Sequence, residues 1–376
     1  MALTSKANQM RQDGEDVIVL TVGEPDFDTP EYIKEAAKIA IDAGNTKYTS
    51  VDGTLDLKNA IIKKLNDENN LHYSPEEIIV STGCKQSIFN LLQVIIDDGD
   101  EVIIPEPYWV SYADMVIYAG GKPVLLKTTY EDNFNINVKL FASLITDKTK
   151  LFMINSPNNP SGKYFDSVSL KKLSDVLVKN KKIFISSDDI YEHIQWHEEK
   201  FHNILNVCPD LKERTIILNG VSKAYSMTGW RIGYAAGNKD IIKKMKTLQS
   251  QSTSCASSVS QAAACAALKN ICTELPMMKT EYKKRHDFVV KELNNIDGVL
   301  CKETDGTFYV FPSFHEYIKK SKLINNDKEL ALHLLNKAKV AVVPGSAFGL
   351  EGHIRISIAI DIESLKIAIK RMMAIL

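Results

Sequence analysis

The chain has 376 residues, 44% of them hydrophobic, which is enough for one large domain and a smaller one with ordinary globular cores. Its 46 basic and 47 acidic residues give a net charge of −1 without a basic stripe, which argues against nucleic-acid or membrane partners and favours a small-molecule ligand. Six cysteines without C-x-x-C spacing, together with the lack of an apolar leader or a membrane-spanning run, predict a soluble cytoplasmic protein.

From about residue 54 to residue 236, short β-branched runs alternate with longer amphipathic stretches such as 85–96 and 167–178. This alternation is typical of helices packed on both faces of a mainly parallel sheet. The predicted strands are 78–81, 101–104, 123–127, 151–155, 183–187, 215–219 and 231–235. We therefore predict an α/β fold whose large domain, residues 25–265, has a mainly parallel sheet flanked by helices.

Beyond residue 238 the regular alternation of strand and helix is lost. A helix-rich section runs to about residue 299, and a closing helix starts at residue 362. Between them lie shorter predicted strands at 307–311, 340–343 and 354–359. We predict a smaller α+β domain from residues 1–24 and 266–376, including a long interdomain helix near 276–293.

In open α/β sheets, ligands collect beyond the carboxyl ends of the strands, so the turns there are the candidate ligand-binding segments. The turn Thr82-Gly-Cys-Lys-Gln86 precedes a helix whose free backbone N–H groups could hold a phosphate, although any strand-to-helix turn uses glycine. In the next turn, Pro105-Glu-Pro-Tyr-Trp109, the ring of Trp109 could stack on a flat ligand or simply cap the core.

Two further turns carry polar groups. The turn Ser156-Pro-Asn-Asn-Pro-Ser-Gly162 holds adjacent asparagines, which offer more donors and acceptors than a turn needs and favour a ligand role. Asp188 ends a predicted buried strand, where a carboxylate needs a cationic or donor partner. That partner could be a protonated heteroaromatic nitrogen, and the alternative is a helix-capping aspartate.

Lys223 follows an apolar strand in a small polar turn, and Arg231 lies eight residues later on the next apolar run. A desolvated lysine amine forms a Schiff base with a carbonyl, and an arginine suits a phosphate. Arg355, at the start of a strand in the second domain, could capture a carboxylate, although an isolated arginine is more often in a surface ion pair. Taken together, the turns indicate pyridoxal phosphate acting on an amino acid.

The chain resembles the class I aminotransferases of fold type I, specifically the bacterial aspartate aminotransferase branch, nearly from end to end. The motifs that carry the resemblance are Gly23-Glu-Pro-Asp-Phe-Asp-Thr-Pro30, Lys47-Tyr-Thr49, Thr82-Gly-Cys-Lys-Gln86, Pro107-Tyr-Trp109, Asn155-Ser-Pro-Asn-Asn-Pro-Ser-Gly162, Ser187-Asp-Asp-Ile-Tyr191, Ser222-Lys223, Gly229-Trp-Arg-Ile-Gly-Tyr234 and His353-Ile-Arg-Ile-Ser357. Relatives carry a further N-terminal segment that folds over the substrate, whereas this chain starts almost at its first helix.

The resemblance implies that Lys223 forms the internal aldimine with pyridoxal 5′-phosphate and shuttles the substrate proton. Asp188 would pair with the pyridine nitrogen, although the residue after it is Asp189, where the family usually has glutamate. Asn159 and Tyr191 would hold the cofactor's phenolic oxygen.

The ring of Trp109 would stack on the cofactor and border the substrate. The remaining implied contacts concern the phosphate and the substrate carboxylate. The phosphate would be held by the backbone of Gly83, Cys84 and Lys85, by Arg231, and by Tyr48 from a second subunit, which makes a homodimer necessary. The substrate α-carboxylate would be held by Arg355, Asn159 and the backbone at Gly23.

The expected reaction is ping-pong transamination between an L-amino acid, most of all aspartate, and 2-oxoglutarate. No motif marks the residue that reads a distal carboxylate, so an aromatic, alanine or prephenate aminotransferase, or a β-lyase on the same fold, stays open. A cofactor-binding regulatory module is disfavoured because nothing resembles an appended DNA-binding domain. No metal site is expected, because no H-E-x-x-H motif is present and His193 and His197 are predicted to lie in a solvated loop.

Overall fold

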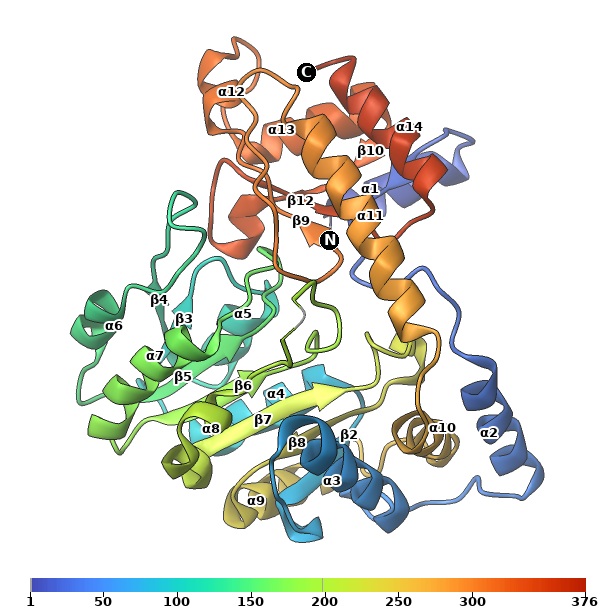
Figure 1. Ribbon diagram of the computed structural model, residues 1–376, viewed down its shortest axis with the longest axis vertical. Coiled ribbons are helices and arrows are strands. Elements are labelled where there is room, and N and C mark those ends of the chain that lie inside the picture. The colour runs from blue at the N-terminus through green and yellow to red at the C-terminus, as the bar shows by residue number, and fades with distance from the viewer. Residues whose placement is uncertain (1, 198) are drawn as a thin grey trace.

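The computed structural model describes residues 2–197 and 199–376, and its largest feature is a seven-stranded sheet (Figure 1). The strand order is β2-β8-β7-β6-β5-β3-β4, and β8 alone runs antiparallel to its neighbours. The strands are β2 (Ile78–Ser81), β3 (Glu101–Pro105), β4 (Lys122–Leu126), β5 (Thr149–Asn155), β6 (Phe184–Asp188), β7 (Thr215–Gly220) and β8 (Gly233–Ala236). The predicted fold class, a mainly parallel sheet flanked by helices, is confirmed.

Apolar residues fill both faces of this sheet, because successive side chains in a strand point to opposite sides. In β7, for example, Ile216 and Leu218 belong to one core while Ile217 belongs to the other. The first core is covered by α2 (Glu31–Asp42), α3 (Leu55–Asn69), α6 (Val138–Leu144), α7 (Ser167–Lys179), α8 (Ile204–Val207) and α10 (Ser258–Lys269). The second is covered by α4 (Cys84–Ile95), α5 (Ser111–Tyr118) and α9 (Lys239–Ser250).

A third core joins the two ends of the chain. Leu20 packs in the same cluster as Val310, Ile356 and Leu365, and strand β1 pairs in parallel with β10. Figure 1 shows α1 in this part of the molecule, where it contacts β10. The elements here are α1 (Ala2–Gln12), β1 (Ile18–Val19), β9 (Tyr309–Val310), α12 (His315–Lys320), α13 (Asp327–His333), β10 (Val340–Ala341), β11 (Val343–Pro344), β12 (Ile354–Ser357) and α14 (Ile362–Met373).

The long helix α11 (Leu275–Leu293) runs between the sheet and the third core (Figure 1). Its first residue, Leu275, packs against the first core, whereas Met278 and Leu293 lie in the third. The prediction of a long connecting helix is therefore confirmed, with bounds that differ by one residue at its start.

Two strand predictions need correction. Arg231 does not lie on a strand, because its φ of 55° places it in a left-handed turn and β8 begins only at Gly233. The predicted strand 340–343 is two short strands, β10 and β11, which pair with different partners. The other predicted strands are confirmed, with ends shifted by a few residues or fewer.

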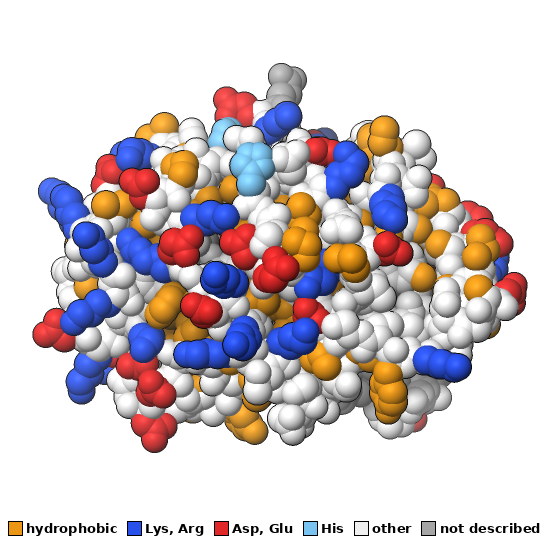
Figure 2. Space-filling model, turned by 90° about the horizontal axis from the view of Figure 1, so that it is seen from below, with side chains coloured by type: hydrophobic (Ala, Val, Ile, Leu, Met, Phe, Trp, Pro, Cys, Tyr) orange, Lys and Arg blue, Asp and Glu red, His pale blue; other side chains and the backbone are white. Residues whose placement is uncertain are grey.

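The surface carries both charges. On the face shown in Figure 2, basic and acidic side chains are interspersed, in keeping with the nearly neutral composition. In the part of the chain that the structure describes, no helix combines the length and the apolar character needed to cross a bilayer.

Candidate active site

The polar turns singled out in the sequence meet at one edge of the large sheet. Asn155 at the end of β5 and Asp188 at the end of β6 are direct neighbours in the strand register. Because β8 is antiparallel, it begins at the edge where the other strands end, and Gly233 pairs there with both Ser81 and Gly220. This reversal brings the turn before β8 to the same edge as the turns after β2, β6 and β7.

Lys223 lies three residues beyond the end of β7, with its amine pointing to the N-terminal segment. Its Nζ donates a hydrogen bond to the carbonyl of Gly23 and lies 5.8 Å from the ring centre of Tyr191. Burial, and then the positive charge of Arg355, lower the pKa of Lys223 to about 8. A lysine with such a pKa exists in part as a neutral amine near physiological pH, which suits a nucleophile or a proton acceptor.

The two adjacent aspartates after β6 have separate surroundings. Asp188 is 5% exposed and accepts hydrogen bonds from Tyr112 Oη at 2.5 Å and from the backbone of Ile190 at 3.3 Å. Asp189 accepts instead from the side chains of Ser187 and Asn203. Burial raises the pKa of Asp188 to about 6, and no lysine or arginine among the described residues forms an ion pair with it.

The start of α4 forms an open turn against Arg231. Gly83 precedes the helix with φ 84°, and a Cβ on Gly83 would lie 2.3 Å from Arg231 Nη2, so only glycine leaves room for the guanidinium. The free N–H groups of α4, including those of Cys84 and Lys85, begin at this point. Arg231 also donates to the carbonyl of Thr228 at 2.7 Å. Such a turn is suited to a phosphate.

Trp109 follows the end of β3 by four residues and lies beside Lys85 at the start of α4. Its ring meets the ring of Tyr112 edge to face, with centroids 5.4 Å apart. The amine of Lys85 lies 4.7 Å from the centroid of Trp109. Burial, followed by repulsion from Arg231, lowers the pKa of Lys85.

A second guanidinium comes from the third core. Arg355 on β12 is 7% exposed, and its Nη1 donates to Asn159 Oδ1 at 3.0 Å while its Nη2 donates to the carbonyl of Thr21 at 2.6 Å. Its Nε is buried without a hydrogen-bond partner among the described residues. A buried donor without a partner costs free energy, so this group is prepared for an anionic ligand.

Tyr309 supports both Arg355 and Tyr191. The guanidinium carbon of Arg355 lies 4.4 Å from the centroid of Tyr309, and the hydroxyls of Tyr309 and Tyr191 are 3.0 Å apart. A Cβ on Gly23 would lie 2.6 Å from the Tyr309 hydroxyl, so a glycine is needed there. Burial raises the pKa of Tyr191, which keeps its hydroxyl protonated and able to donate.

Tyr48 stands apart from this group within one chain. Its side chain is 91% exposed, in the segment between α2 and α3. His193, predicted to lie in a solvated loop, is instead partly buried beside Glu68 and Glu192, and these three groups are the one cluster of metal-ligand type among the described residues. The ammonium of Lys64 already lies against both carboxylates.

Sequence reasoning missed Tyr112 and Tyr309. Tyr112 follows Trp109 by three residues, where helical geometry can place both rings on one side, so this spacing was a usable signal. Tyr309 lies in a short apolar run, Phe308–Phe311, and nothing in that run distinguishes it from a core residue. Its place in the site follows only from its contacts with Arg355 and Tyr191.

The chain is similar to known proteins over almost its whole length. The family model described as aminotransferase class I and II matches residues 15–372. An aspartate/prephenate aminotransferase of Nitrosomonas europaea is 48% identical over 381 residues, which cover 100% of this chain and 96% of that protein. An aspartate aminotransferase of Rhizobium meliloti is 45% identical over 378 residues, covering 100% and 92%.

Solved structures agree with these relatives. The crystal structure of the aspartate aminotransferase from Rhizobium meliloti superposes with a TM-score of 0.96 at 44% identity, covering 99% of this chain and 94% of that one. The Thermus thermophilus aspartate aminotransferase with maleate gives a TM-score of 0.93 at 40% identity, covering 100% and 96%.

Proposed function

Because the chain belongs to the class I and II aminotransferases, a family that uses pyridoxal 5′-phosphate, we propose that it transfers the amino group of L-aspartate to 2-oxoglutarate. The observation that carries this proposal is the meeting of Lys223, Asp188, Arg231 and Arg355 around one sheet edge. These residues supply an amine, a buried carboxyl group and two guanidinium groups to one site.

The residues at this edge fit the cofactor. Asp188 would face the pyridine nitrogen, whose positive charge would relieve the cost of its burial. Asn159 and Tyr191 would hold the phenolic oxygen, and Trp109 would cover the ring. The phosphate would lie at the start of α4, on the backbone of Gly83, Cys84 and Lys85 and on Arg231. When bound, pyridoxal phosphate supplies an aldehyde that accepts an amino group and a ring that withdraws electrons from the substrate Cα.

Lys223 would act at two atoms. Its lowered pKa of about 8 gives a useful fraction of neutral amine, so Nζ would be the group that holds the cofactor and, when free, would accept the proton from the substrate Cα. Arg355 would orient the substrate by pairing with its α-carboxylate, with Asn159 and the backbone at Gly23 alongside. The fixed orientation keeps the Cα proton within reach of Nζ.

The amine of Lys85 is our candidate for reading the distal carboxylate of aspartate. It lies over Trp109, and among the described residues it forms no ion pair. The side-chain carboxylate of aspartate would form an ion pair with this ammonium, whereas the side chain of alanine or phenylalanine would not. The motif around Lys85 did not mark its side chain as a reader of the distal carboxylate, because a lysine at the start of a helix is usually a surface residue.

The proposal also includes the dimer, the cellular compartment and the division into domains. We infer a homodimer in which the exposed Tyr48 completes the phosphate site of the partner subunit. Six free thiols support a reducing, cytoplasmic setting. We also keep the division into residues 25–265 and residues 1–24 with 266–376, because the third core draws on both ends of the chain.

Prephenate is the second candidate substrate, because the Nitrosomonas europaea relative is named for both aspartate and prephenate. Initial rates of amino-group transfer from aspartate, phenylalanine and alanine to 2-oxoglutarate, and from aspartate and glutamate to prephenate, test the proposal. We expect aspartate to give the highest kcat/KM among the donors. A higher value for phenylalanine or alanine would reject aspartate, and no transfer with any pair would reject the aminotransferase function itself.

A further inference from the structure

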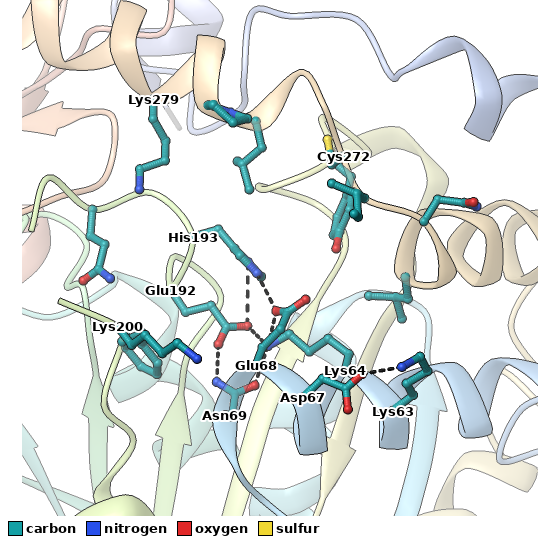
Figure 3. A pocket seen from close by; sticks show the side chains of 18 of the residues that line it. Lys63, Lys64, Asp67, Glu68, Asn69, Glu192, His193, Lys200, Cys272 and Lys279 are labelled. Atoms are coloured by element: carbon teal, nitrogen blue, oxygen red, sulfur yellow. Dashed lines mark hydrogen bonds and ion pairs between the residues drawn. The ribbon is translucent and has the colours of Figure 1, made fainter. Parts of the chain in front are cut away.

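A cavity of about 860 Å³ lies beside the turn that carries Tyr191, and a buried ion pair forms part of its wall (Figure 3). Lys64 from α3 and Glu192 from the turn form this pair, and their side chains are only 2% and 3% exposed. Figure 3 shows both residues pointing toward one another, with Asn69 and His193 close by. The pair is separate from the groups that would touch the cofactor.

Glu192 has its hydrogen-bonding capacity largely filled. Its Oε1 accepts from Lys64 and from Asn219 Nδ2 at 2.6 Å, and its Oε2 accepts from Asn69 Nδ2 at 2.7 Å. Lys64 also donates to Asn69 Oδ1 at 2.7 Å. On the cavity side, His193 Nε2 lies 2.8 Å from Glu68 Oε2. These contacts join α3, the turn after β6 and the end of β7.

Stability alone does not account for this arrangement. Burying two charges costs desolvation free energy, and replacing a buried pair by neutral groups of similar shape is often neutral or stabilising. Removing one partner, in contrast, leaves an unpaired buried charge and is strongly destabilising. Net stability is therefore a weak explanation for this fully bonded pair, and the geometry that it imposes is the alternative.

That geometry leads to the proposed site from two directions. Glu192 follows Tyr191 directly, so a fixed Glu192 side chain limits the movement of the backbone that carries the Tyr191 ring, whose hydroxyl lies 3.0 Å from that of Tyr309. Asn219 accepts a hydrogen bond from the backbone N–H of Gly220 at 2.7 Å, at the strand end that leads to Lys223. The network thus connects the backbone at Tyr191 and the strand end before Lys223 to the same carboxylate, that of Glu192.

We propose that Glu192, held by Lys64, is a positioning residue that fixes the Tyr191 hydroxyl relative to the strand end carrying Lys223. This inference rests on the proposed aminotransferase function, because it concerns the alignment of two groups that would contact the cofactor. It predicts that the network tunes catalysis and the bound cofactor's electronic properties, beyond any contribution to folding.

The test compares Lys64→Met and Glu192→Gln, singly and together, with the matched control Lys63→Met. Lys63 lies one residue away on the same helix and lines the same cavity, but its ion pair with Asp67 is exposed. Three properties are measured: the thermal midpoint without cofactor, the affinity of the cofactor-free protein for pyridoxal phosphate, and the pH at which the absorbance of the bound cofactor changes. kcat and KM for aspartate are measured alongside.

Both single variants should lower the thermal midpoint and lower kcat about tenfold, with KM changed less than about twofold, because a small misplacement acts mainly on the reacting geometry. The double variant should regain the thermal midpoint, since no unpaired charge remains, yet keep the low kcat and a displaced absorbance transition. Lys63→Met should match the wild type in all of these measurements. In a Tyr191→Phe background, Glu192→Gln should lower kcat by less than about twofold.

Recovery of kcat and absorbance together with the thermal midpoint in the double variant would reduce the pair to a folding element and overturn the proposal. An undiminished effect of Glu192→Gln in the Tyr191→Phe background would also overturn it. The proposed function fails differently, because the wild-type protein itself would then transfer no amino group. Should the single variants fail to fold, the double variant and its Tyr191→Phe derivative still show whether the pair affects kcat through Tyr191.

Discussion

At Asp188, burial and hydrogen bonding act on one carboxyl group in opposite directions. Burial raises its pKa to about 6, and the hydrogen bond from Tyr112 limits that rise. The usual pKa of an aspartate is about 3.9, so the folded cofactor-free protein binds more protons than the unfolded chain between about pH 4 and pH 6. The stability contributed by this group therefore falls as the pH rises through that window.

Asp188→Asn removes this titration. We expect the cofactor-free wild-type protein to lose stability relative to the variant as the pH rises from about 4 to about 6, and to show a constant difference above that window. Urea unfolding of both cofactor-free proteins across this range measures the difference. A pH-independent difference would contradict the raised pKa, and Asp175→Asn, an exposed position, is the control.

The same substitution tests catalysis. Asp188→Asn should still bind pyridoxal phosphate but lower kcat by about 10² to 10³-fold, because an amide cannot hold the positive charge on the ring nitrogen. Single-turnover rates with aspartate measure the effect without product release. A rate near that of the wild type would argue that Asp188 does not face the pyridine nitrogen.

Tyr112→Phe isolates the hydrogen bond from the ring. The variant keeps the edge-to-face contact with Trp109 but removes the donor to Asp188, so the pKa of Asp188 should rise further. Infrared difference spectra of the carboxyl C=O stretch against pH in the cofactor-free protein follow this change. Because hydrogen bonds to charged groups contribute roughly 1.5–3 kcal/mol, we expect a clear displacement, and an unchanged titration would show that Tyr112 has no effect on the carboxyl group.

At the scale of elements, the start of α4 depends on a glycine. Gly83→Ala places a side chain in a backbone with φ 84° and brings its Cβ to 2.3 Å from Arg231 Nη2. We expect the cofactor-free protein to fold and its affinity for pyridoxal phosphate to fall about tenfold or more, because Arg231 must move away from the proposed phosphate site. Fluorescence titration with the cofactor measures this.

Gly14→Ala is a matched control for backbone strain. Gly14 has a similar φ of 88°, but a Cβ there would meet no atom within 4 Å. Both variants should lose comparable stability, while only the change at Gly83 should weaken cofactor binding. Equal cofactor affinities in the two variants would mean that the start of α4 is not the phosphate site.

Elements also show what the sequence could and could not predict. Periodicity located the strands because apolar runs alternate between two buried faces, as at Ile216 and Ile217. It failed at Arg231, because an apolar run gives no sign that the preceding turn is left-handed or that β8 is antiparallel. Lys223 and Asp188 were predictable from their turns, whereas Tyr309 was not, because its contacts come from residues distant in the chain.

At the scale of the whole molecule, the proposed homodimer requires two chains to share each site. Tyr48 is 91% exposed, and in one chain it has no contact with the group around Lys223 among the described residues. If it completes the partner's phosphate site, a substitution of Tyr48 in one chain must weaken cofactor binding in the other chain. Hybrid dimers therefore distinguish a Tyr48 that completes the partner's site from a Tyr48 that serves its own chain.

We predict complementation between Tyr48→Phe and Lys223→Ala chains. Lys223→Ala alone should be inactive and lack the absorbance of lysine-bound cofactor, while Tyr48→Phe alone should bind the cofactor more weakly. If Tyr48 reaches across the interface, a hybrid dimer has one site with neither substitution, because both substitutions fall in the other site. Differently tagged chains, purified as hybrids and titrated with pyridoxal phosphate, should show one site of wild-type affinity and about half the wild-type activity per dimer. If each Tyr48 served its own chain, every functional site in the hybrid would bind the cofactor as weakly as the Tyr48→Phe protein does.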